Sequence, residues 1–500
     1  MANVTVENDE GVVSTDPTPQ HHVGASAEAL PESLDLHSCL PTQVGVKSSR
    51  YQVVNPINSI QNAKTIEFQV QSAGDELIDP HHTYLFLAVR ILGPDGAVIP
   101  SQIPDTSVGA QPNAKKHNPV SDVLLVNGVG HMLFQNCKVK LNDVIISHGD
   151  GMYAYRGDLE TRLMWPEGVK RSMMQLAGFD ADEDELSFDD ALAATDDKGI
   201  TWEAPATGKY HHCINKRILR TRDSKTHMVV SRIHSEIFEQ PKFLPKSTRL
   251  YVAFDRQEFP NEFCILAKQA HDAQQYTIDI VKCNLLMRMV TVDEEVLSEI
   301  QTSGTMGQKY LYPIRRVDMS YFTKENSSDY SHPNLFMDGD ALPRRIFIAF
   351  VKRGAFTGDQ QMDPFAYQDL DIKTVGLRVG GEHRPYPLIN IDRGSDTGHA
   401  LLVFQLLDST GSLYDETDIG ISMDNYKKKS NILGFDLTNV KTRLGENYEL
   451  PLNKSCDFEL TNKFKNTRGV MSMIVYAEYD AEIEMDALFN VRKKNFGTAE

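Results

Sequence analysis

The chain has 500 residues, of which 41% are hydrophobic and 24% are charged, and its formal net charge at pH 7 is −18. A chain of this length is too long for one ordinary core, so two or more domains are expected, and the composition excludes a wholly disordered protein. No apolar run approaches the length of a membrane-spanning helix, and the first residues lack the basic and apolar regions of a secretory signal. We therefore expect neither feature.

The negative charge is concentrated in two segments. Residues 1–46 contain seven acidic residues and no lysine or arginine, and residues 180–197 contain nine acidic residues, again without a base. We expect residues 1–48 to form a mobile acidic arm, and we place the second segment in an insertion at about 167–225. An acidic excess of this size argues against tight binding of a nucleic-acid backbone, so no direct sequence-specific nucleic-acid binding is expected.

The cysteines are few and widely spaced. They number six, none is part of a CxxC pair, and they lie at positions 39, 137, 213, 264, 283 and 456. This pattern predicts reduced thiols in a cytosolic or nuclear setting rather than a disulfide framework. Cys137 and Cys283 fall within predicted strands and should be buried.

Strand signals dominate the first half of the chain. In Thr65–Gln71 apolar and polar residues alternate, which places Ile66, Phe68 and Val70 on one face. Residues 84–92 form a denser apolar run, typical of a strand buried on both faces. Further strands are expected at 133–141, 144–146, 228–238, 249–254 and 277–292.

Two local signals interrupt these strands in the first half. Asn142-Asp143 predicts a tight turn between two strands. Met152, Tyr155, Leu159 and Leu163 are spaced as one helix face, and Pro166 should stop that helix.

The second half repeats the same order after a polar linker at 293–308. Strands are expected at 310–322, 344–351, 370–379, 432–437 and 456–464. A bulge is expected near Lys373-Thr374, where the alternation changes phase. Gly380-Gly381 takes the place of the Asn-Asp turn, and residues 399–407 take the place of the short helix.

The last predicted strand, Met471–Asp486, has the longest regular alternation. Its odd positions are all apolar, and its even positions are all acidic from Glu478 onward. At about 3.3 Å per residue it would be roughly 50 Å long, so it needs a large sheet or barrel to pack against. We expect the acidic row to be a solvated outer face; the alternatives are a subunit contact with a basic strand such as Arg344-Arg345, or capture of Ca²⁺.

This repeated order predicts the fold class. Many strands, little helix and no alternation of strand with helix indicate an all-β protein of two tandem eight-stranded antiparallel jelly rolls, with short helices in connecting loops. The first jelly roll is assigned to 49–292 and the second to 309–490, with a C-terminal tail at 491–500.

Several stretches, taken in their order and spacing from about residue 50 to 490, resemble a known family. They are GHMLFQNCKVKLNDVIIS, YAYRGDLETRL, HSEIFEQPKFLPKSTRLYVAF, YPIRRVDMSYFT, LPRRIFIAFVKRGAFTGDQQMDPFAYQDLDIKTVGLRVGG, ILGFDLT and IVYAEYDAEIEMD. The chain resembles the double jelly-roll major capsid proteins of Polinton/Maverick elements and adintoviruses, within the adenovirus hexon lineage.

The resemblance implies a structural protein that forms homotrimers of pseudo-hexagonal outline and tiles an icosahedral shell. It implies neighbouring capsomers and a penton or minor capsid protein as partners. It also implies a place in the virion, with synthesis in the host cytoplasm and assembly there or in the nucleus. The acidic arm and the 167–225 insertion depart from the family, which says little about them.

The sequence contains only weak signals for a metal-binding or catalytic site. His211-His212-Cys213 lacks the second ligand pair of a zinc site, and no HxH accompanies it or His81-His82, so a cupin-type metalloenzyme is not supported. The signatures GxSxG, HExxH and GxxxxGK[ST] are absent. We expect no enzyme activity and no catalytic, cofactor or metal residues. The alternative function is a soluble jelly-roll module that binds carbohydrate or protein.

Overall fold

The computed structural model describes residues 42–495, apart from 62, 73, 106–114, 122, 148, 182–211, 268–275, 326–328, 334, 337–340, 371, 393–397, 416, 439–447, 449–454 and 463–468. The acidic arm and most of the second acidic segment lie outside these residues. The described residues from Gly45 onward belong to one compact unit.

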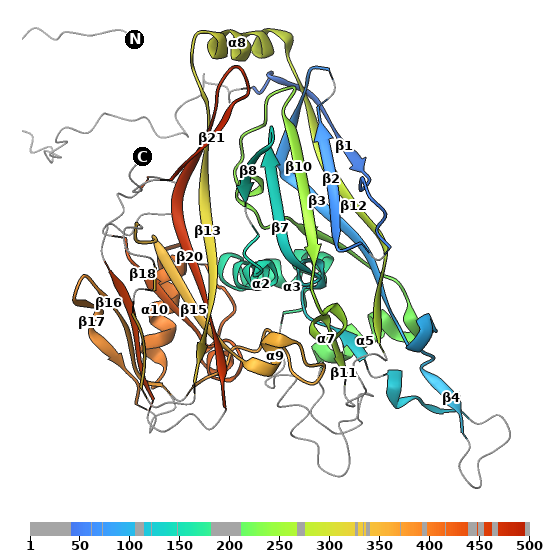
Figure 1. Ribbon diagram of the computed structural model, residues 1–500, viewed down its shortest axis with the longest axis vertical. Helices are drawn as coiled ribbons and strands as arrows, with labels where there is room; N and C mark the ends of the chain where they lie inside the picture. Colours follow the sequence, from blue (N-terminus) through green and yellow to red (C-terminus); the bar gives the residue numbers. More distant parts are fainter. Residues whose placement is uncertain are drawn as a thin grey trace, which may run out of the picture. The chain divides into compact units, whose positions relative to one another are not determined.

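The first half of this unit builds a barrel from two four-stranded antiparallel sheets (Figure 1). One sheet has the order β1-β12-β3-β9, and the other has the order β2-β10-β7-β8. The strands are β1 (Val46–Val54), β2 (Thr65–Gln71), β3 (Glu76–Leu92), β7 (Phe134–Leu141), β8 (Val144–Ser147), β9 (His227–Arg232), β10 (Arg249–Arg256) and β12 (Thr277–Val292). Because the first and last strands are neighbours in one sheet and the chain crosses repeatedly between the sheets, the barrel is a jelly roll.

The second half repeats this topology strand for strand. Its sheets have the orders β13-β20-β15-β18 and β14-β19-β16-β17. The strands are β13 (Tyr310–Lys324), β14 (Asp329–His332), β15 (Arg345–Lys352), β16 (Ile372–Val379), β17 (Glu382–Asn390), β18 (Ile432–Asp436), β19 (Cys456–Asn462) and β20 (Met471–Met485). The predicted fold of two tandem eight-stranded jelly rolls is confirmed.

The alternation of apolar residues explains how the strands pack. In β2, Ile66, Phe68 and Val70 are buried while Gln69 and Gln71 are exposed. The odd positions of β20 are all buried, and all of them except Ala477 and Tyr479 belong to the hydrophobic core. The expected bulge is present, because the pairing of β16 with β19 shifts register between Ile372 and Thr374. These features follow from the period of two in a strand.

The two predicted turns use residues that tolerate positive φ. Asn142 and Asp143 have φ of 46° and 71° between β7 and β8. Gly380 and Gly381 have φ of 58° and 90° between β16 and β17. Asn, Asp and Gly accept this conformation at low cost, which is why they close tight hairpins.

Some boundaries differ from those expected. The strand expected at 228–238 ends at Arg232 and is followed by helix α6 (Glu236–Glu239). The strand expected from residue 84 begins at Glu76, because the chain stays extended through Pro80. The segment expected as a linker contains helix α8 (Glu294–Thr305), whose first turn is capped by the Asp293 carboxylate accepting from the Glu295 N–H.

The segment expected as a tail also forms regular structure. Residues 491–495 form strand β21 (Val491–Asn495), which pairs antiparallel with β20. In this register Arg492 lies opposite Glu484 and Lys494 lies opposite Glu482. The basic residues of β21 therefore lie beside acidic residues of β20, a pairing of opposite charges that favours the strand.

The helices lie in the segments that connect the strands. Helix α2 (Tyr153–Met164) follows β8, as predicted, and helix α10 (Ala400–Thr410) follows β17. The insertion expected outside the core contributes α3 (Glu167–Arg171), η4 (Met173–Ala177), α5 (His212–Thr221) and η5 (Arg222–Ser224), and Ile214 and Ile218 of α5 join the core. Shorter elements are η2 (Pro94–Gly96), β4 (Gln102–Pro104), β5 (Lys115–His117), η3 (Pro119–Ser121), β6 (Val123–Leu125), α1 (Val129–Met132), α7 (Pro260–Cys264), β11 (Ile265–Ala267), α9 (Arg353–Thr357), α11 (Ser412–Asp415) and α12 (Met423–Lys428).

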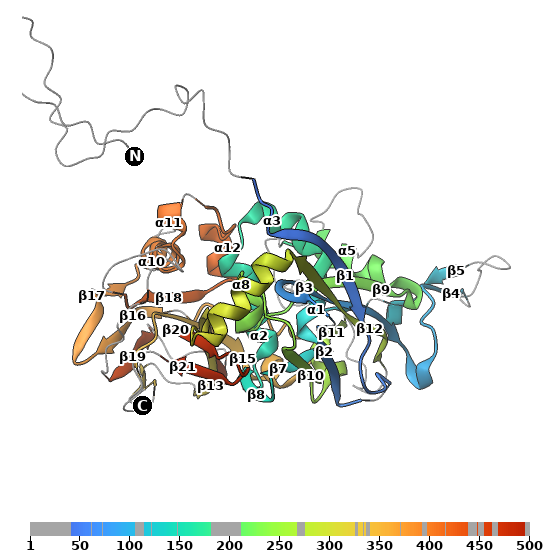
Figure 2. The ribbon, with the colours of Figure 1, turned by 90° about the horizontal axis from the view of Figure 1, so that it is seen from above.

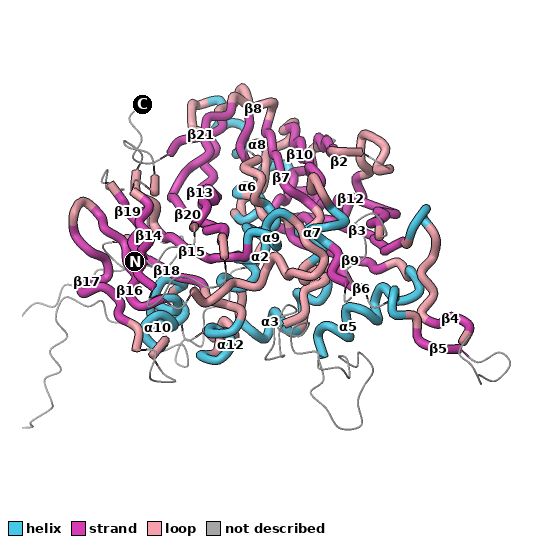
Figure 3. The backbone as a smooth tube through the Cα atoms, turned by 60° about the horizontal axis from the view of Figure 1, so that its bottom comes forward, coloured by secondary structure: helices cyan, strands magenta, loops and turns pink. Residues whose placement is uncertain are grey.

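The helices are unevenly distributed over the unit. Figures 2 and 3 both show α10, α12, α3 and α5 along one side of the unit, next to the strands of the two barrels. Among the described residues, no helix combines the length and the apolar character needed to cross a bilayer.

The cysteine thiols among the described residues are all buried, and none of them forms a disulfide. These are Cys137, Cys213, Cys264, Cys283 and Cys456. Burial raises the pKa of Cys283 to about 12, so this thiol stays protonated and unreactive near neutral pH. The prediction that Cys137 and Cys283 are buried is confirmed.

The orientation of β20 makes a first prediction. Val475 is fully buried and lies between Ser320 of β13 and Ile348 of β15. Val475→Asp places a carboxyl without partners in this core and should cost about 3–5 kcal/mol of unfolding free energy. Thermal melting should show a large loss for Val475→Asp, whereas Thr323→Asp, an exposed position in β13, should melt like wild type. Equal melting temperatures for Val475→Asp and wild type would contradict the strand orientation.

Candidate functional site

Helix α2 is the element that joins the two barrels. All its residues are buried except Met164, which is half-buried. Tyr155, Leu159 and Leu163 form its apolar face, but four of its charged side chains are buried as well: Arg156, Asp158, Glu160 and Arg162. Buried charges are costly unless they are paired and hydrogen-bonded, so their partners determine what can pack against this helix.

The first partners come from the first barrel. Arg156 forms ion pairs with Glu160 at 2.9 Å, with Glu236 of α6 at 3.2 Å and with Glu239 of α6 at 3.5 Å. Burial alone would raise the pKa of Glu160, but Arg156 and His234 outweigh it and hold that pKa well below its ordinary value. Glu160 is therefore a carboxylate in the interior of the protein.

Two buried histidines, His131 and His234, extend the contacts of Glu160. His234 Nδ1 lies beside Glu160 Oε2, and His234 Nε2 lies 3.2 Å from His131 Nε2. Burial lowers the pKa of His131 well below its ordinary value, with His234 adding to the effect. His131 is therefore neutral near pH 7.

The second barrel supplies the remaining partners. The Tyr476 hydroxyl on β20 lies 3.1 Å from Glu160 Oε1 and 3.2 Å from Glu478 Oε1. Arg315 of β13 donates to Glu239 at 2.8 Å and lies 3.6 Å from Glu478. We call the following residues the inter-barrel charge network: Arg156, Glu160, His234, Glu236, Glu239, Arg315, Arg345, Tyr476 and Glu478.

The network corrects the expectation for the acidic row of β20. Glu478 is not on a solvated face: its side chain is completely buried, with Arg345 of β15 at 3.8 Å. Asp480, Glu482, Glu484 and Asp486 are half-buried, and Lys309 reaches Glu484 at 2.7 Å. The outer face of this sheet is buried because the first barrel lies against it. Arg344 pairs with Asp480 at 3.2 Å within the same chain, so the structure shows an intrachain contact of these residues in place of the expected contact between subunits.

A second group of contacts holds the middle of α2. Arg162 pairs with Asp158 at 2.8 Å, and the Tyr367 hydroxyl donates to the same carboxylate at 2.7 Å. Lys170 of α3 donates to the carbonyl oxygen of Arg162 and, at 2.7 Å, to that of Ile419. These contacts join α2 and α3 to loops that follow the strands of the second barrel.

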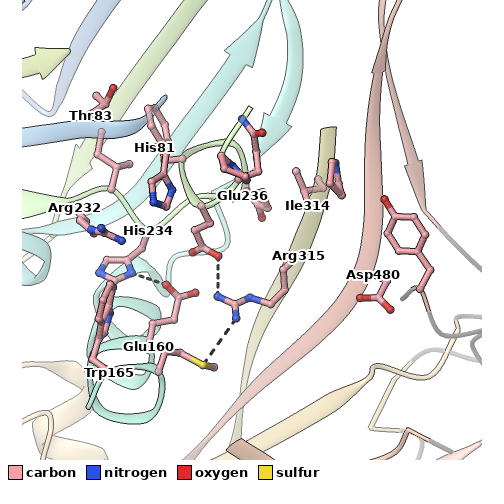
Figure 4. A pocket seen from close by; sticks show the side chains of 18 residues that line it. His81, Thr83, Glu160, Trp165, Arg232, His234, Glu236, Ile314, Arg315 and Asp480 are labelled. Atoms are coloured by element: carbon pink, nitrogen blue, oxygen red, sulfur yellow. Dashed lines mark hydrogen bonds and ion pairs between the residues drawn. The ribbon is translucent and has the colours of Figure 1, made fainter. Parts of the chain in front are cut away.

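A cavity of about 810 Å³ opens beside the network (Figure 4). Its walls carry His81, Trp165, Arg232, Glu239, Arg315 and Asp480. Figure 4 shows Arg315 reaching from β13 toward the side of the cavity that holds Glu160 and His234. The Arg232 guanidinium lies 4.8 Å from the centre of the Trp165 ring, which favours the cation by a cation–π contact.

Among the described residues, Glu160, His234 and Glu239 form a group whose ligand atoms lie within 4.8 Å of one another. These oxygens already accept from arginines, and two guanidinium groups, those of Arg156 and Arg315, lie in contact with them. Their positive charge opposes a metal cation at the same place. These residues therefore hold the two barrels together through ion pairs, and their arrangement is not that of a metal-binding site.

The residues singled out earlier as weak ligand candidates have other surroundings. His82 Nδ1 lies 2.8 Å from Asp79, and His81 lines the cavity. Cys213 lies in α5 with its Sγ 3.0 Å from the carbonyl oxygen of Ala181. His211 lies outside the described residues. Apart from Arg345 and Glu478, the network residues were missed. The spacing of Arg156 to Glu160 by four positions is a helix-pairing signal that could have indicated two of them.

In sequence the chain is similar to an uncharacterized protein of Caenorhabditis elegans, with 23% identity over 456 residues that span 90% of this chain and 98% of the relative. No protein-family model matches it. In fold it is similar to a chain in the cryo-EM structure of the Sputnik virophage, with a TM-score of 0.60 and 12% identity over 95% of this chain and 94% of that chain. A chain in the PBCV-1 virus capsid matches with a TM-score of 0.49 and 9% identity, over 92% of this chain and all of that chain.

The burial of Glu478 makes a second prediction. Glu478→Gln removes the carboxylate charge beside Arg315 and Arg345 and should cost roughly 3 kcal/mol of unfolding free energy, because a buried charge loses its partner. Denaturant unfolding of the variant should show this loss. The matched control is Asp318→Asn, whose exposed carboxylate pairs with Arg316 at 2.8 Å and should contribute less than about 1 kcal/mol. Equal losses for the two variants would contradict the network.

The burial of Lys170 leads to a third prediction, which concerns how the unfolding free energy depends on pH. Burial, with Arg162 adding to it, lowers the pKa of Lys170 to about 7, whereas an unfolded lysine has its ordinary pKa near 10.4. Between these values the unfolded chain holds a proton that the folded chain lacks, so this residue's contribution to stability falls as the pH is lowered toward 7. Relative to Lys170→Met, the unfolding free energy of wild type should rise by about 1.4 kcal/mol per pH unit from pH 7 to 9. A difference that does not change with pH would contradict the assignment.

Proposed function

We propose that this chain is the major capsid protein of an icosahedral virus. The observation that carries the proposal is the duplication: two jelly rolls of identical strand order are fixed side by side by α2 and the inter-barrel charge network. A jelly-roll binding module needs only one barrel to present its loops. Two similar barrels held at a fixed angle are what a shell needs from its building block.

The proposed mechanism is geometric. Three chains bring six similar barrels together, so a homotrimer has a pseudo-hexagonal outline and can tile a surface. The two barrel domains are 49–292 and 309–490, and the partners are neighbouring capsomers with a penton or minor capsid protein where the tiling changes symmetry. The protein works in the virion, and its role is structural rather than enzymatic.

The lineage we propose is that of Polinton/Maverick elements and adintoviruses. The likeness to the Sputnik virophage chain extends over nearly the whole of both chains, which supports a capsid protein of this double-barrel kind. The relative in Caenorhabditis elegans is matched over almost its full length. A full-length relative in an animal is what an element carried in animal genomes would leave.

Oligomeric state tests this function. A capsomer should be stable, with an obligate interface of several thousand Å². Light scattering of the purified chain should give a mass three times that of the 56.2 kDa chain, unchanged on dilution to micromolar concentration. A monomer mass under these conditions would contradict the proposal.

A further inference from the structure

The cavity beside the inter-barrel charge network has walls from both halves of the chain. Its volume is about 810 Å³, and ligand pockets in proteins commonly measure about 300–1,000 Å³. Apolar side chains come from the first half at Met164, Trp165 and Phe238, and from β13 at Pro313 and Ile314. A small molecule with an apolar part therefore fits this space, and it would contact both barrels.

The acidic side chains in the wall already have cationic partners. Three of them form ion pairs with the Arg156 guanidinium: Glu160, Glu236 and Glu239. The fourth, Asp480, forms an ion pair at 3.2 Å with an arginine of the second barrel. A cationic ligand would have to compete with these arginines for the carboxylates, so the cavity does not favour a cation.

The basic residue Arg232 differs from the other charged residues of the wall. It is the last residue of β9 and is half-buried, and among the described residues its guanidinium has no ion-pair or hydrogen-bond partner. The guanidinium lies over the Trp165 ring, 4.8 Å from its centre. This cation–π contact leaves the N–H donors of the guanidinium unused. Within the described lining, Arg232 is therefore the cation that still lacks an anion.

The nearest titratable neighbour does not supply that anion. Figure 4 shows His81 and Arg232 on the side of the cavity opposite Asp480. Burial lowers the pKa of His81, and the charge of Arg232 adds to the effect. His81 is therefore neutral near pH 7, and the positive charge of Arg232 acts on its surroundings without being cancelled.

We propose that this cavity binds a small organic anion with an apolar body. The anionic group accepts charge-assisted hydrogen bonds from the Arg232 guanidinium, and the apolar part packs on Trp165 and on Pro313 and Ile314 of the second barrel. The site lies within one chain, so it goes beyond the proposed function and does not depend on assembly. Because both barrels contribute walls, a bound molecule stabilises the joint between them.

Octanoate is a suitable probe, because it joins one carboxylate to a short apolar chain. The chain has two tryptophans, Trp165 and Trp202, so in a Trp202→Phe background the emission reports on the cavity wall. Titration with octanoate should change this emission saturably, and calorimetry should give one molecule bound per chain. Octylamine has the same apolar chain with the opposite charge, and it should bind at least about tenfold more weakly.

Substitution of Arg232 tests the residue that recognises the anion. Arg232→Gln removes the charge and should weaken octanoate binding by about tenfold or more, whereas Arg232→Lys keeps the charge and should weaken it less. The matched control is Arg249→Gln, which removes an arginine charge from an exposed position of β10 outside the cavity and should bind octanoate like wild type. Thermal melting of Arg232→Gln without the probe should stay close to that of wild type, because no ion pair is lost.

Three results would overturn the proposal. They are the absence of saturable octanoate binding to wild type, equal binding of octanoate and octylamine, and equal octanoate binding by wild type and a folded Arg232→Gln chain. The comparison of the two probes needs no substitution of Arg232, so it decides the question even if that variant does not fold. A failure of octanoate to bind leaves the proposed function standing, and a monomer mass in light scattering leaves this site standing.

Discussion

The structure depends on the burial of charge along one helix. Arg156, Asp158, Glu160 and Arg162 of α2 lie in the interior, where an unpaired charge costs several kcal/mol. No single barrel supplies all the partners: Glu236 and His234 come from the first, whereas Tyr476 and Tyr367 come from the second half of the chain. The two barrels therefore hold a defined position relative to each other, because any other position would leave some of these charges without partners.

This constraint explains why two barrels of the same topology have sheets of different character. The outer face of β20 carries Tyr476 and Glu478, which are polar groups that meet α2 and its neighbours. The outer face of β12, the counterpart of β20, carries Leu286 opposite Val53 and Tyr84, with Lys282 and Arg288 on the same face. A polar contact specifies one geometry through its hydrogen bonds.

Much of the fold could be predicted because strands leave a simple pattern. Thr65–Gln71 and Thr277–Val292 were predicted to the residue, since alternation and dense apolar runs mark strands directly. Strand β21 was missed because it is short and charged, and its order comes from pairing with β20. Helix α8 was missed although its sequence carries a start signal, since Asp293 caps a first turn that contains Glu294 and Glu295.

The candidate site was harder to predict than the fold. Alternation shows that Glu478 faces out of the second barrel, but it does not show that another barrel covers that face. The apolar even positions Ile474 and Tyr476, just before the acidic row, were the local sign that it is covered. The partners Glu236 and Arg345 are far from α2 in the sequence, so only the folded chain brings them together.

The central claim is that a chain of two rigidly joined barrels is the unit of a pseudo-hexagonal capsomer. Cryo-electron microscopy of the purified assembly tests it most directly. End-on class averages should show six barrel-sized densities in a ring with threefold symmetry, with the two barrels of each chain in the relation described here. Averages with twofold symmetry, or single two-barrel particles, would contradict the account.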